Sequence, residues 1–496
     1  MATAASARQQ AYQQKKQQLS TQMKRKVQQS GVNITLKKKT SNLFRHRRSN
    51  LNQIDVRTFN QVISVDKEKM LAEVEGMTTY EDLVAETLKY GFMPAVVPEL
   101  KSITIGGALS GLGIESSCFR YGLVHETIIQ YDILLPDGRV VDCRPDNEFS
   151  DLFFAIPNSY GTLGYALKVT VKLVPVKKYV KLTFHHFKKP EEFFSHIKAV
   201  CLANRLDGAV AFVDGVVFAR DHQVLILGEM TDEAPNVSNY KYMKIYYKAV
   251  ANKQQDYVTI KDYIWRWDPD WFWCSKVFYM QHPLLRLLCG KWALKSRVYS
   301  KLMRFAKRSA VVQWLSKHFA QSTESVIQDV VIPIENAPHY LEFFHDNIGI
   351  TPVWICPTYR LDENAHYNLF NMRENQLYVN FGFWDMIPSR KGPGYYIRNY
   401  YQYGKITGQK IDYRFFCSSQ YFADTDFSDP LFCGIRRKSQ KSQTGNEYAD
   451  YCEITKYSAR LLFCIILRSQ VVIHKIVAKG KCGAKFVPFL FHETEC

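Results

Sequence analysis

The sequence predicts an α+β protein of two domains, in which a glycine-rich loop is the central feature. The chain has 496 residues, of which 46% are hydrophobic, so it can bury a core in each of two domains. Runs of alternating apolar residues, typical of strands, are interspersed with capped helical segments. Five glycines crowd the stretch between residues 97 and 122. Because glycine lacks a Cβ, this stretch is either a backbone cradle for an anion or a plain turn-rich loop.

Charge and cysteine content exclude several function classes. The net charge is +18, and residues 1–50 hold twelve Lys or Arg and no Asp or Glu, which is two thirds of the excess. We expect no nucleic-acid partner, because the globular part has neither an RNA-recognition aromatic pattern nor zinc-finger spacing. The twelve cysteines form no C-x-x-C pair, which favours reduced thiols and predicts neither a metal site nor a disulfide framework.

Residues 1–30 predict a basic, Gln- and Lys-rich tail. Leu19, Met23 and Val27 have helical spacing, but their stripe is narrow, so a partly disordered tail is favoured over a basic helix making peripheral membrane contact. A transit peptide is a further alternative, although its usual bias is not Gln and Lys. The sequence has no run of about 18 apolar residues and no signal peptide. We therefore expect a cytoplasmic protein, or one peripheral on an intracellular membrane of the endoplasmic-reticulum type.

The elements around the glycine loop follow in a regular order. Residues 62–65 and 71–74 predict paired strands. Thr78-x-x-Glu81 is a capping box that predicts the start of a helix ending near Gly91. Inside the loop, Gly107-Ala108-Leu109 predicts a short helix whose start favours an anion.

Beyond the loop, a hairpin and a second glycine turn are predicted. Residues 131–135 and 140–143 predict strands joined by the turn Pro136-Asp137-Gly138. The turn Gly161-Thr162-Leu163-Gly164 leads into an alternating strand over residues 166–173.

This order resembles the FAD-binding domain of the vanillyl-alcohol-oxidase (PCMH) type. Within that superfamily, VPELKSITIGGALSGLGIESSCFRYGL and PNSYGTLGYALKVTVKLVPVKKYVKL resemble the Δ24-sterol reductases of the Diminuto/seladin group. The resemblance is specific over residues 62–182 and weaker to about residue 382. It implies a two-part FAD-binding PCMH-type domain and a mixed α/β substrate (cap) domain built on an antiparallel sheet. The expected boundaries are a tail over 1–30, the FAD-binding domain over 31–177, the cap domain over 178–408 and a divergent C-terminal segment over 409–496.

The cap domain is expected to contain buried strands and an aromatic cluster. Strands are predicted over residues 182–185, 209–213, 223–227, 328–333, 352–357 and 376–382. Residues 262–276 hold four Trp, for which core packing is favoured over an aromatic wall against a sterol. Residues 413–416 could be a remnant of the family's closing segment. Residues 434–496 match nothing and are either a divergent extension or the product of an altered gene model.

The resemblance implies FAD as cofactor, and we expect it to be bound non-covalently. Residues 40–45 replace the loop that in some relatives carries an attachment histidine, and the context of His46 does not match that motif. Arg45, Arg47 and Arg48 could pair with phosphate or form an exposed basic loop. By resemblance, the cofactor-binding residues are Thr104, Ile105, Gly106, Gly107, Ala108, Leu109, Ser110, Gly111, Leu112, Gly113, Ile114, Glu115, Ser116, Gly161, Thr162, Leu163 and Gly164.

The implied reaction is the reduction of the C24–C25 double bond of a sterol side chain, with NADPH as reductant. Hydride goes to one alkene carbon and an acid must protonate the other. Glu115, Tyr378 and Lys276 are candidates for that acid, but a structural role is favoured for each, so the catalytic residues stay unknown. Two alternatives remain: a flavin oxidase or dehydrogenase of an alcohol or hydroxy acid, and a catalytically impaired flavin-fold binding protein. The apolar, aromatic character of the predicted cap sheet favours a sterol or another apolar substrate.

Overall fold

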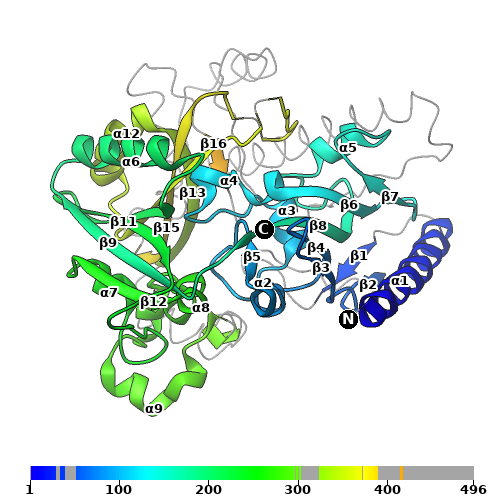
Figure 1. Cartoon of the computed structure of the whole chain (residues 1–496), viewed down its shortest axis with the longest axis horizontal. Helices are drawn as coiled ribbons and strands as arrows, with labels where there is room; N and C mark the ends of the chain where they lie inside the picture. The colour runs from blue at the N-terminus through cyan, green and yellow to red at the C-terminus, as the bar shows by residue number, and fades with distance from the viewer. Residues whose placement is uncertain are drawn as a thin grey trace, which may run out of the picture.

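Two antiparallel sheets, each belonging to one domain, form the body of the molecule (Figure 1). The computed structural model describes residues 2–29, 34–38, 52–302 except 297 and 300, 323–388 except 363 and 371, and 414–416. Within these residues the chain is α+β, as the sequence predicts.

The sheet of the first domain has six strands, all paired antiparallel. Its order is β3 (Val62–Asp66), β4 (Leu71–Glu75), β8 (Tyr165–Pro175), β6 (Ile128–Leu134) and β7 (Val140–Cys143), with β5 (Phe92–Pro94) also pairing with β8. All of these strands except β5 overlap strands predicted from the sequence. The long strand β8 lies at the centre of this sheet, and its first residues, directly after the preceding turn, pair with β6.

Short helices connect these strands. They are α2 (Tyr80–Thr87), α3 (Ile105–Ser110), α4 (Cys118–Tyr121) and α5 (Ser150–Ala155). The N-cap of α2 is one residue later than predicted. Thr79 caps the helix, accepting a hydrogen bond at its Oγ1 from the N–H of Asp82 at 3.2 Å, while Thr78 is fully buried before it. The chain leaves this helical segment through Gly91, whose φ of 79° is the left-handed conformation expected there.

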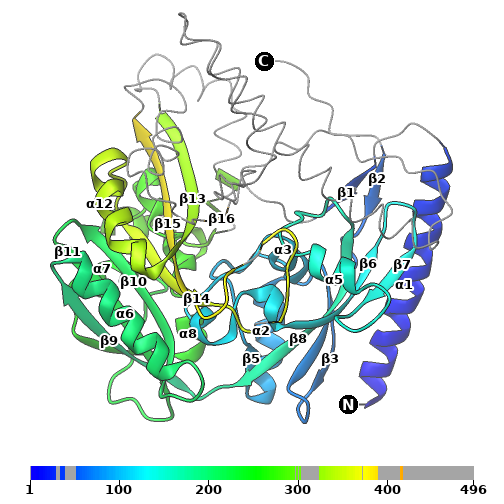
Figure 2. The ribbon, with the colours of Figure 1, turned by 90° about the horizontal axis from the view of Figure 1, so that it is seen from above.

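The N-terminal segment differs from the predicted tail, because it forms the helix α1 (Ala2–Gln28), which packs along the first domain (Figure 2). Tyr12, Leu19 and Met23 are buried against that domain. The Tyr12 hydroxyl donates to Asp132 Oδ2 at 2.6 Å, and Lys16 Nζ is 3.0 Å from the same oxygen. The narrow apolar stripe therefore packs against the protein itself, so Leu19 and Met23 are not available to a membrane.

Replacing Tyr12 by Phe should loosen α1. The variant removes one of the two donors to Asp132 Oδ2 and leaves Lys16 as the other, a loss of about 0.5–1.5 kcal/mol. We expect faster hydrogen exchange in the α1 amides and a lower thermal midpoint. Tyr279→Phe is the matched control, because that side chain is exposed. Unchanged exchange in Tyr12→Phe would show that the hydrogen bond does not hold the helix.

The second domain is built on an eight-stranded sheet, antiparallel throughout. Its order is β12 (Gln255–Thr259), β9 (Tyr179–Phe187), β11 (His222–Thr231), β10 (Val210–Ala219), β14 (Val353–Tyr359), β15 (Leu377–Pro388), β13 (Thr323–Pro333) and β16 (Arg414–Phe416). All six strands predicted in this domain are present. The pairing of β16 with β13 places the predicted remnant at the edge of the cap sheet.

The two faces of the cap sheet have different partners. The helices α6 (Pro190–Asn204) and α12 (Ala337–Asn347) cover one face and share a core with Val330, Ile332 and Phe381. The opposite face, which includes Val331 and Tyr378, belongs to one continuous core with the first domain. This second face therefore joins the two domains.

The Trp-rich segment packs into that shared core. Trp267 and Trp273 are buried, with ring centroids 5.9 Å apart, and Trp354 of β14 belongs to the same core. This agrees with the core-packing interpretation of residues 262–276.

The remaining elements are short. They are α7 (Tyr246–Val250), α8 (Ile260–Ile264), α9 (Pro283–Ala293) and the parallel pair β1 (Thr35–Lys37) and β2 (Gln53–Asp55). Over the described part of the chain, no helix has both the length and the apolar character needed to cross a membrane.

Candidate functional site

The two glycine-containing loops predicted to share a cofactor lie against each other. The N–H of Tyr160, just before the Gly161–Gly164 turn, donates to the carbonyl oxygen of Ser110 in α3 at 3.0 Å. A Cβ placed on Gly111 would lie 3.8 Å from the Tyr160 ring. Fifty residues apart in sequence, the loops thus form one continuous surface of the first domain.

Three of the predicted glycines are required by packing within the protein. A Cβ on Gly106 would lie 2.8 Å from the carbonyl oxygen of Gly76. On Gly113 it would lie 2.7 Å from Val124, and on Gly164 it would lie 2.5 Å from Ile133. These glycines let the loops pack tightly on the sheet. Their spacing in the sequence could not show whether they serve this packing or contact with a ligand.

Two other glycines are exposed at the junction of the loops. Gly107 lies in the first turn of α3, and Gly161, with a φ of 79°, lies in the second loop. Each is within a few residues of the contact between Ser110 and Tyr160. Since neither carries a side chain, a flat ligand can approach the backbone from both loops here.

The backbone N–H groups at the start of α3 are largely satisfied within the protein. Ile105 donates to the carbonyl of Thr78 and Gly106 to that of Gly76, both at 3.0 Å. The Gly107 N–H donates to Thr104 Oγ1 at 3.3 Å. The anion cradle expected at this helix start is therefore already engaged.

A buried acceptor next to the second loop is available for a ligand. Asn158 Oδ1 has no hydrogen-bond partner among the described residues, while Nδ2 of the same side chain donates to the Leu369 carbonyl at 2.8 Å. This unpaired acceptor and the two exposed glycines fit a large planar cofactor with hydrogen-bond donors, which FAD is. The assignment of the individual residues of Thr104–Ser116 and Gly161–Gly164 to the cofactor stays a prediction. The predicted phosphate partners Arg45, Arg47 and Arg48, together with residues 40–44 and His46, lie outside the described residues.

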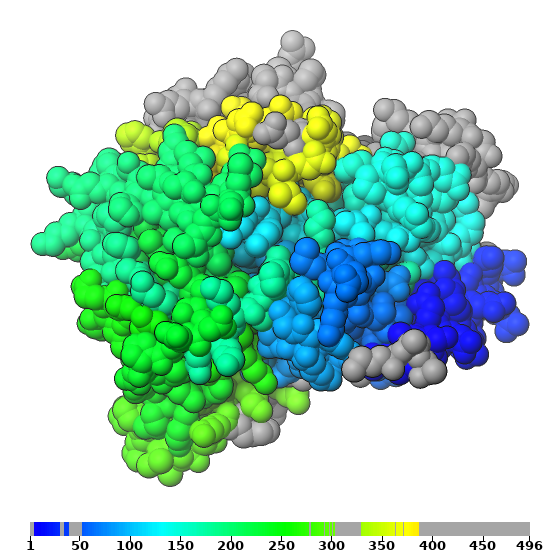
Figure 3. Space-filling model, in the orientation of Figure 1, coloured from blue at the N-terminus to red at the C-terminus, as the bar shows by residue number. Residues whose placement is uncertain are grey.

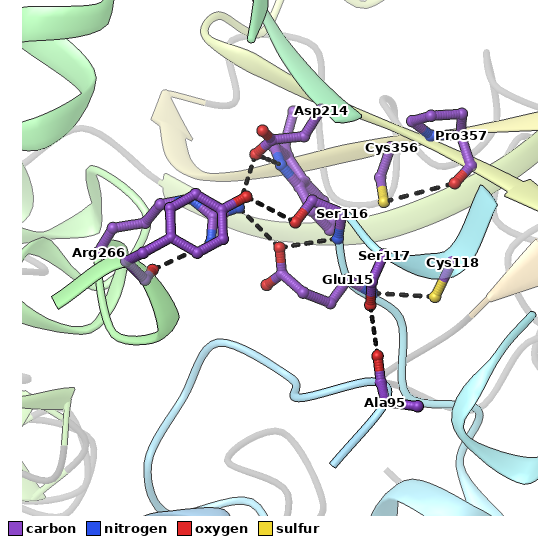
Figure 4. Close-up of polar contacts among 11 residues, drawn as sticks. Ala95, Glu115, Ser116, Ser117, Cys118, Asp214, Arg266, Cys356 and Pro357 are labelled. Atoms are coloured by element: carbon purple, nitrogen blue, oxygen red, sulfur yellow. Dashed lines mark hydrogen bonds and ion pairs between the residues drawn. The ribbon is translucent and has the colours of Figure 1, made fainter. Parts of the chain in front are cut away.

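A buried ionic network connects the end of the glycine loop to the cap domain (Figure 4). Arg266 Nη2 donates to Glu115 Oε1 at 2.6 Å and to Asp214 Oδ2 of β10 at 2.8 Å. Its guanidinium lies 4.1 Å from the centre of the Tyr263 ring, and the Tyr263 hydroxyl is 2.8 Å from Ser116 Oγ. Glu115 and Ser116 are thus held by the cap domain.

The charges of this network are almost wholly removed from water. Arg266, Glu115 and Asp214 are buried, and Trp354 Nε1 also donates to Asp214 Oδ2 at 3.1 Å. Burial, and then the charge of Glu115, raise the pKa of the neighbouring Glu99 well above its usual value, which favours its neutral form. Of these three carboxyl groups, Arg266 contacts those of Glu115 and Asp214.

Sequence reasoning did not identify Arg266, Asp214 or Glu99. The only available signal was that Arg266 is a cation between two tryptophans, Trp265 and Trp267. A cation in such a setting is buried only if it is paired.

A second polar group lies on the cap face that meets the first domain. Asp329 of β13 lies beside Gly382 of β15, where a Cβ would be only 2.9 Å from its Oδ1. Asn380 Nδ2 donates to that oxygen at 3.0 Å, and Asn380 Oδ1 has no partner among the described residues. Burial raises the pKa of Asp329 to about 7, so a large share of this carboxyl is protonated near neutral pH.

The three acids suggested from sequence are each engaged in the protein. Glu115 is in the ionic network, and Lys276 Nζ pairs with Asp385 Oδ2 at 2.6 Å. Tyr378 is fully buried, and its hydroxyl accepts from the N–H of Arg373 at 3.1 Å. These contacts agree with the structural roles favoured for them.

Comparison with known proteins finds similarity to an FAD-binding domain family and to sterol reductases. The family described as FAD binding domain matches residues 15–144. The Delta(24)-sterol reductase of Homo sapiens is 30% identical over 314 residues, covering 60% of this chain and 57% of the human protein. The Delta(24)-sterol reductase of Pisum sativum is 29% identical over 327 residues, 62% of this chain and 56% of the plant protein. The Delta(24)-sterol reductase homolog of Caenorhabditis elegans is 28% identical over 343 residues, 65% of this chain and 63% of the nematode protein. The matches thus span less than two thirds of these relatives.

Proposed function

Since this chain carries an FAD-binding domain of the PCMH type and is related to the Delta(24)-sterol reductases, we propose that it reduces the C24–C25 double bond of a sterol side chain with NADPH. The observation that carries the proposal is the contact between Ser110 and Tyr160, which brings the two loops of the predicted cofactor site together. The relatives supply the substrate class, and the chain's own residues supply the site.

Bound FAD would supply the two-electron chemistry, taking a hydride from NADPH and delivering it to one carbon of the alkene. The residues around Gly107 and Gly161 would hold this cofactor without a covalent bond. The network of Arg266 would fix the end of the first loop relative to the cap, so that cofactor and substrate keep one separation.

The face of the cap sheet that meets the first domain is apolar and aromatic. Val331, Trp354 and Tyr378 share the core between the domains. A hydroxy acid would need a cationic partner to bind well, whereas a sterol side chain needs apolar surface. This composition favours the reductase over an oxidase of polar acids.

We assign the proton-donating role to Asp329. An isolated alkene accepts hydride poorly unless the second carbon is protonated as the first receives it. Asp329 is partly buried on the cap face, its pKa of about 7 keeps much of it neutral, and Asn380 orients its carboxyl group. A neutral carboxylic acid in this position can release its proton to carbon, and water would restore that proton afterwards.

The visible spectrum of the purified protein tests the proposal. We expect a yellow protein that NADPH bleaches anaerobically and that desmosterol, a sterol with a C24–C25 double bond, reoxidises. The saturated sterol cholesterol is the matched control and should not reoxidise it. Bleaching by a hydroxy acid instead would indicate an oxidase, and a colourless protein that takes up no added FAD would indicate a binding protein.

A pair of adjacent glycines separates packing from cofactor contact. Gly106→Ala should unfold the loop, because its Cβ would meet the backbone of Gly76. Gly107→Ala should cost far less stability, because the only nearby atom is Thr104 Oγ1, the side-chain acceptor that caps α3, at 2.9 Å from the added Cβ. If Gly107 faces the cofactor, Gly107→Ala should weaken FAD binding about tenfold, or ~1.4 kcal/mol, in a flavin titration. Wild-type FAD affinity in a folded Gly107→Ala variant would exclude this glycine from the cofactor site.

A further inference from the structure

The helix α9 of the cap domain reverses the usual arrangement of apolar and charged residues. Its Arg286 is buried, with Nη1 2.8 Å from Asp270 Oδ1 and Nε donating to the Tyr242 carbonyl at 2.6 Å. Its leucines face outward: Leu284, Leu287 and Leu288 are 56%, 61% and 72% exposed. An amphipathic helix on a water-facing surface would bury the leucines and expose the arginine.

The surface near these leucines is basic. Between Trp271 and Leu302 the sequence has six Lys or Arg and no Asp or Glu, and the next acidic residue is Glu324. Lys291, Lys295 and Lys301 are exposed, and none forms an ion pair with a carboxylate that the structure describes. Exposed Leu side chains and unpaired Lys side chains thus occur on the same part of the chain.

Figures 1 and 3 show that this part of the chain protrudes from the cap domain, away from α1. Tyr279, four residues before the start of α9, and Leu302, after the helix, are also exposed. Three exposed leucines on neighbouring turns of one helix are unusual on a water-facing surface and mark a contact site.

We infer that α9 docks on a lipid surface with anionic headgroups. Leucines that enter the boundary between headgroups and acyl chains, next to lysines that meet acidic headgroups, are the two components of interfacial binding. A second copy of this chain is a poorer partner, because a symmetric contact through α9 would bring the unpaired lysines of both copies together.

This inference goes beyond the proposed function and does not depend on it, because it rests on α9 and its lysines alone. Docking would also place the cap domain at the membrane, in which an apolar substrate dissolves. The exposed leucines of α9 are separate from α1, whose apolar stripe is buried. The membrane contact that the sequence suggested at the N-terminus is therefore inferred at the cap domain instead.

Vesicle flotation of the full-length protein tests the inference. The vesicles contain phosphatidylcholine alone or mixed with phosphatidylserine. We expect binding to the mixed vesicles, and a partition coefficient at least about tenfold lower for Leu284→Ser/Leu287→Ser/Leu288→Ser, since each buried leucine contributes to transfer from water. Leu206→Ser is the control, because Leu206 is 87% exposed but follows α6 at a different edge of the domain. It should float like the wild type.

Charge is tested separately. Lys291→Gln/Lys295→Gln/Lys301→Gln should abolish the preference for phosphatidylserine while retaining the wild-type thermal midpoint. The inference is overturned if the triple serine variant floats like the wild type. It is also overturned if light scattering shows a wild-type dimer that this variant converts to monomer, or if that variant melts earlier with unchanged flotation, since the leucines would then serve a protein contact.

Discussion

Asp329→Asn should lower the turnover of a C24–C25 sterol alkene by at least ~100-fold while leaving reduction of the flavin by NADPH unchanged. The substitution keeps the size of the side chain and removes the transferable proton. Anaerobic stopped-flow absorbance separates the two half-reactions: bleaching by NADPH proceeds at the wild-type rate, and reoxidation by the sterol becomes slow.

The pH profile adds a readout that a purely structural role would not produce. Burial raises the pKa of Asp329 to about 7. The acid is therefore in its donating form below that pH and loses its proton as the pH rises through it. We expect the rate of wild-type flavin reoxidation by the sterol to fall above about pH 7. The residual rate of Asp329→Asn should not show this fall, the alkaline limb of the pH profile.

Two controls accompany this variant. Asp221→Asn removes an exposed carboxyl at the β10–β11 turn and should leave both half-reactions unchanged. Asn380→Ala removes the donor to Asp329 Oδ1, which stabilises the ionised form, so it should shift the limb to higher pH. If the sterol reoxidises Asp329→Asn at the wild-type rate, Asp329 is not the proton donor. The proposed function would then be supported only by the contact between the two glycine-containing loops.

The sheets could be predicted because their strands carry local signals. The strand β8 alternates over most of its length and follows a glycine turn, while β14 and β15 are apolar runs. Such patterns reflect burial of one or both faces and need no knowledge of the partner strand. The six strands predicted for the cap are therefore all found, although nothing in the sequence indicated their order.

The helix α1 could not be predicted with the same certainty, because its burial depends on distant partners. Its stripe is narrow, and the rest of the helix is Gln-rich and exposed. The decisive contact joins Tyr12 to Asp132, which is 120 residues away. The misplaced cap of α2 has a simpler cause, since Thr78 and Thr79 are adjacent and both have an acidic residue three positions on.

Only part of the site could be predicted, because contacts between residues far apart in the sequence leave no local pattern. The glycines of both loops stand out in the sequence, but whether each serves packing or a ligand depends on what opposes it, as Gly106 and Gly107 illustrate. Arg266 meets Asp214 and Glu115 at separations of 52 and 151 residues, and no local pattern encodes such contacts. Asp329 lies within a predicted strand that is otherwise mostly apolar, so the sequence did not indicate a role for its carboxyl group.

Arg266→Met should destabilise the protein more than any other single change considered, by about 3–5 kcal/mol. The variant leaves Glu115 and Asp214 buried without their cation, next to the raised-pKa carboxyl of Glu99. We expect a thermal midpoint lower by roughly 5–10 °C, together with loss of bound flavin, because the end of the glycine loop is no longer held by the cap. Differential scanning fluorimetry and the ratio of flavin to protein absorbance measure the two effects.

Two further variants show whether unpaired buried charge is the cause. Arg220→Met breaks the exposed pair with Asp346 and should cost at most about 1 kcal/mol. Glu115→Gln/Asp214→Asn/Arg266→Met removes the charges together, so most of the lost thermal stability should return, since a neutralised network avoids the desolvation cost of its carboxylates. If the triple variant melts as low as Arg266→Met, the loss comes from the packing of the arginine on Tyr263. If Arg266→Met melts like the wild type, the network does not join the domains, and the fixed separation on which the proposed chemistry depends must come from other contacts.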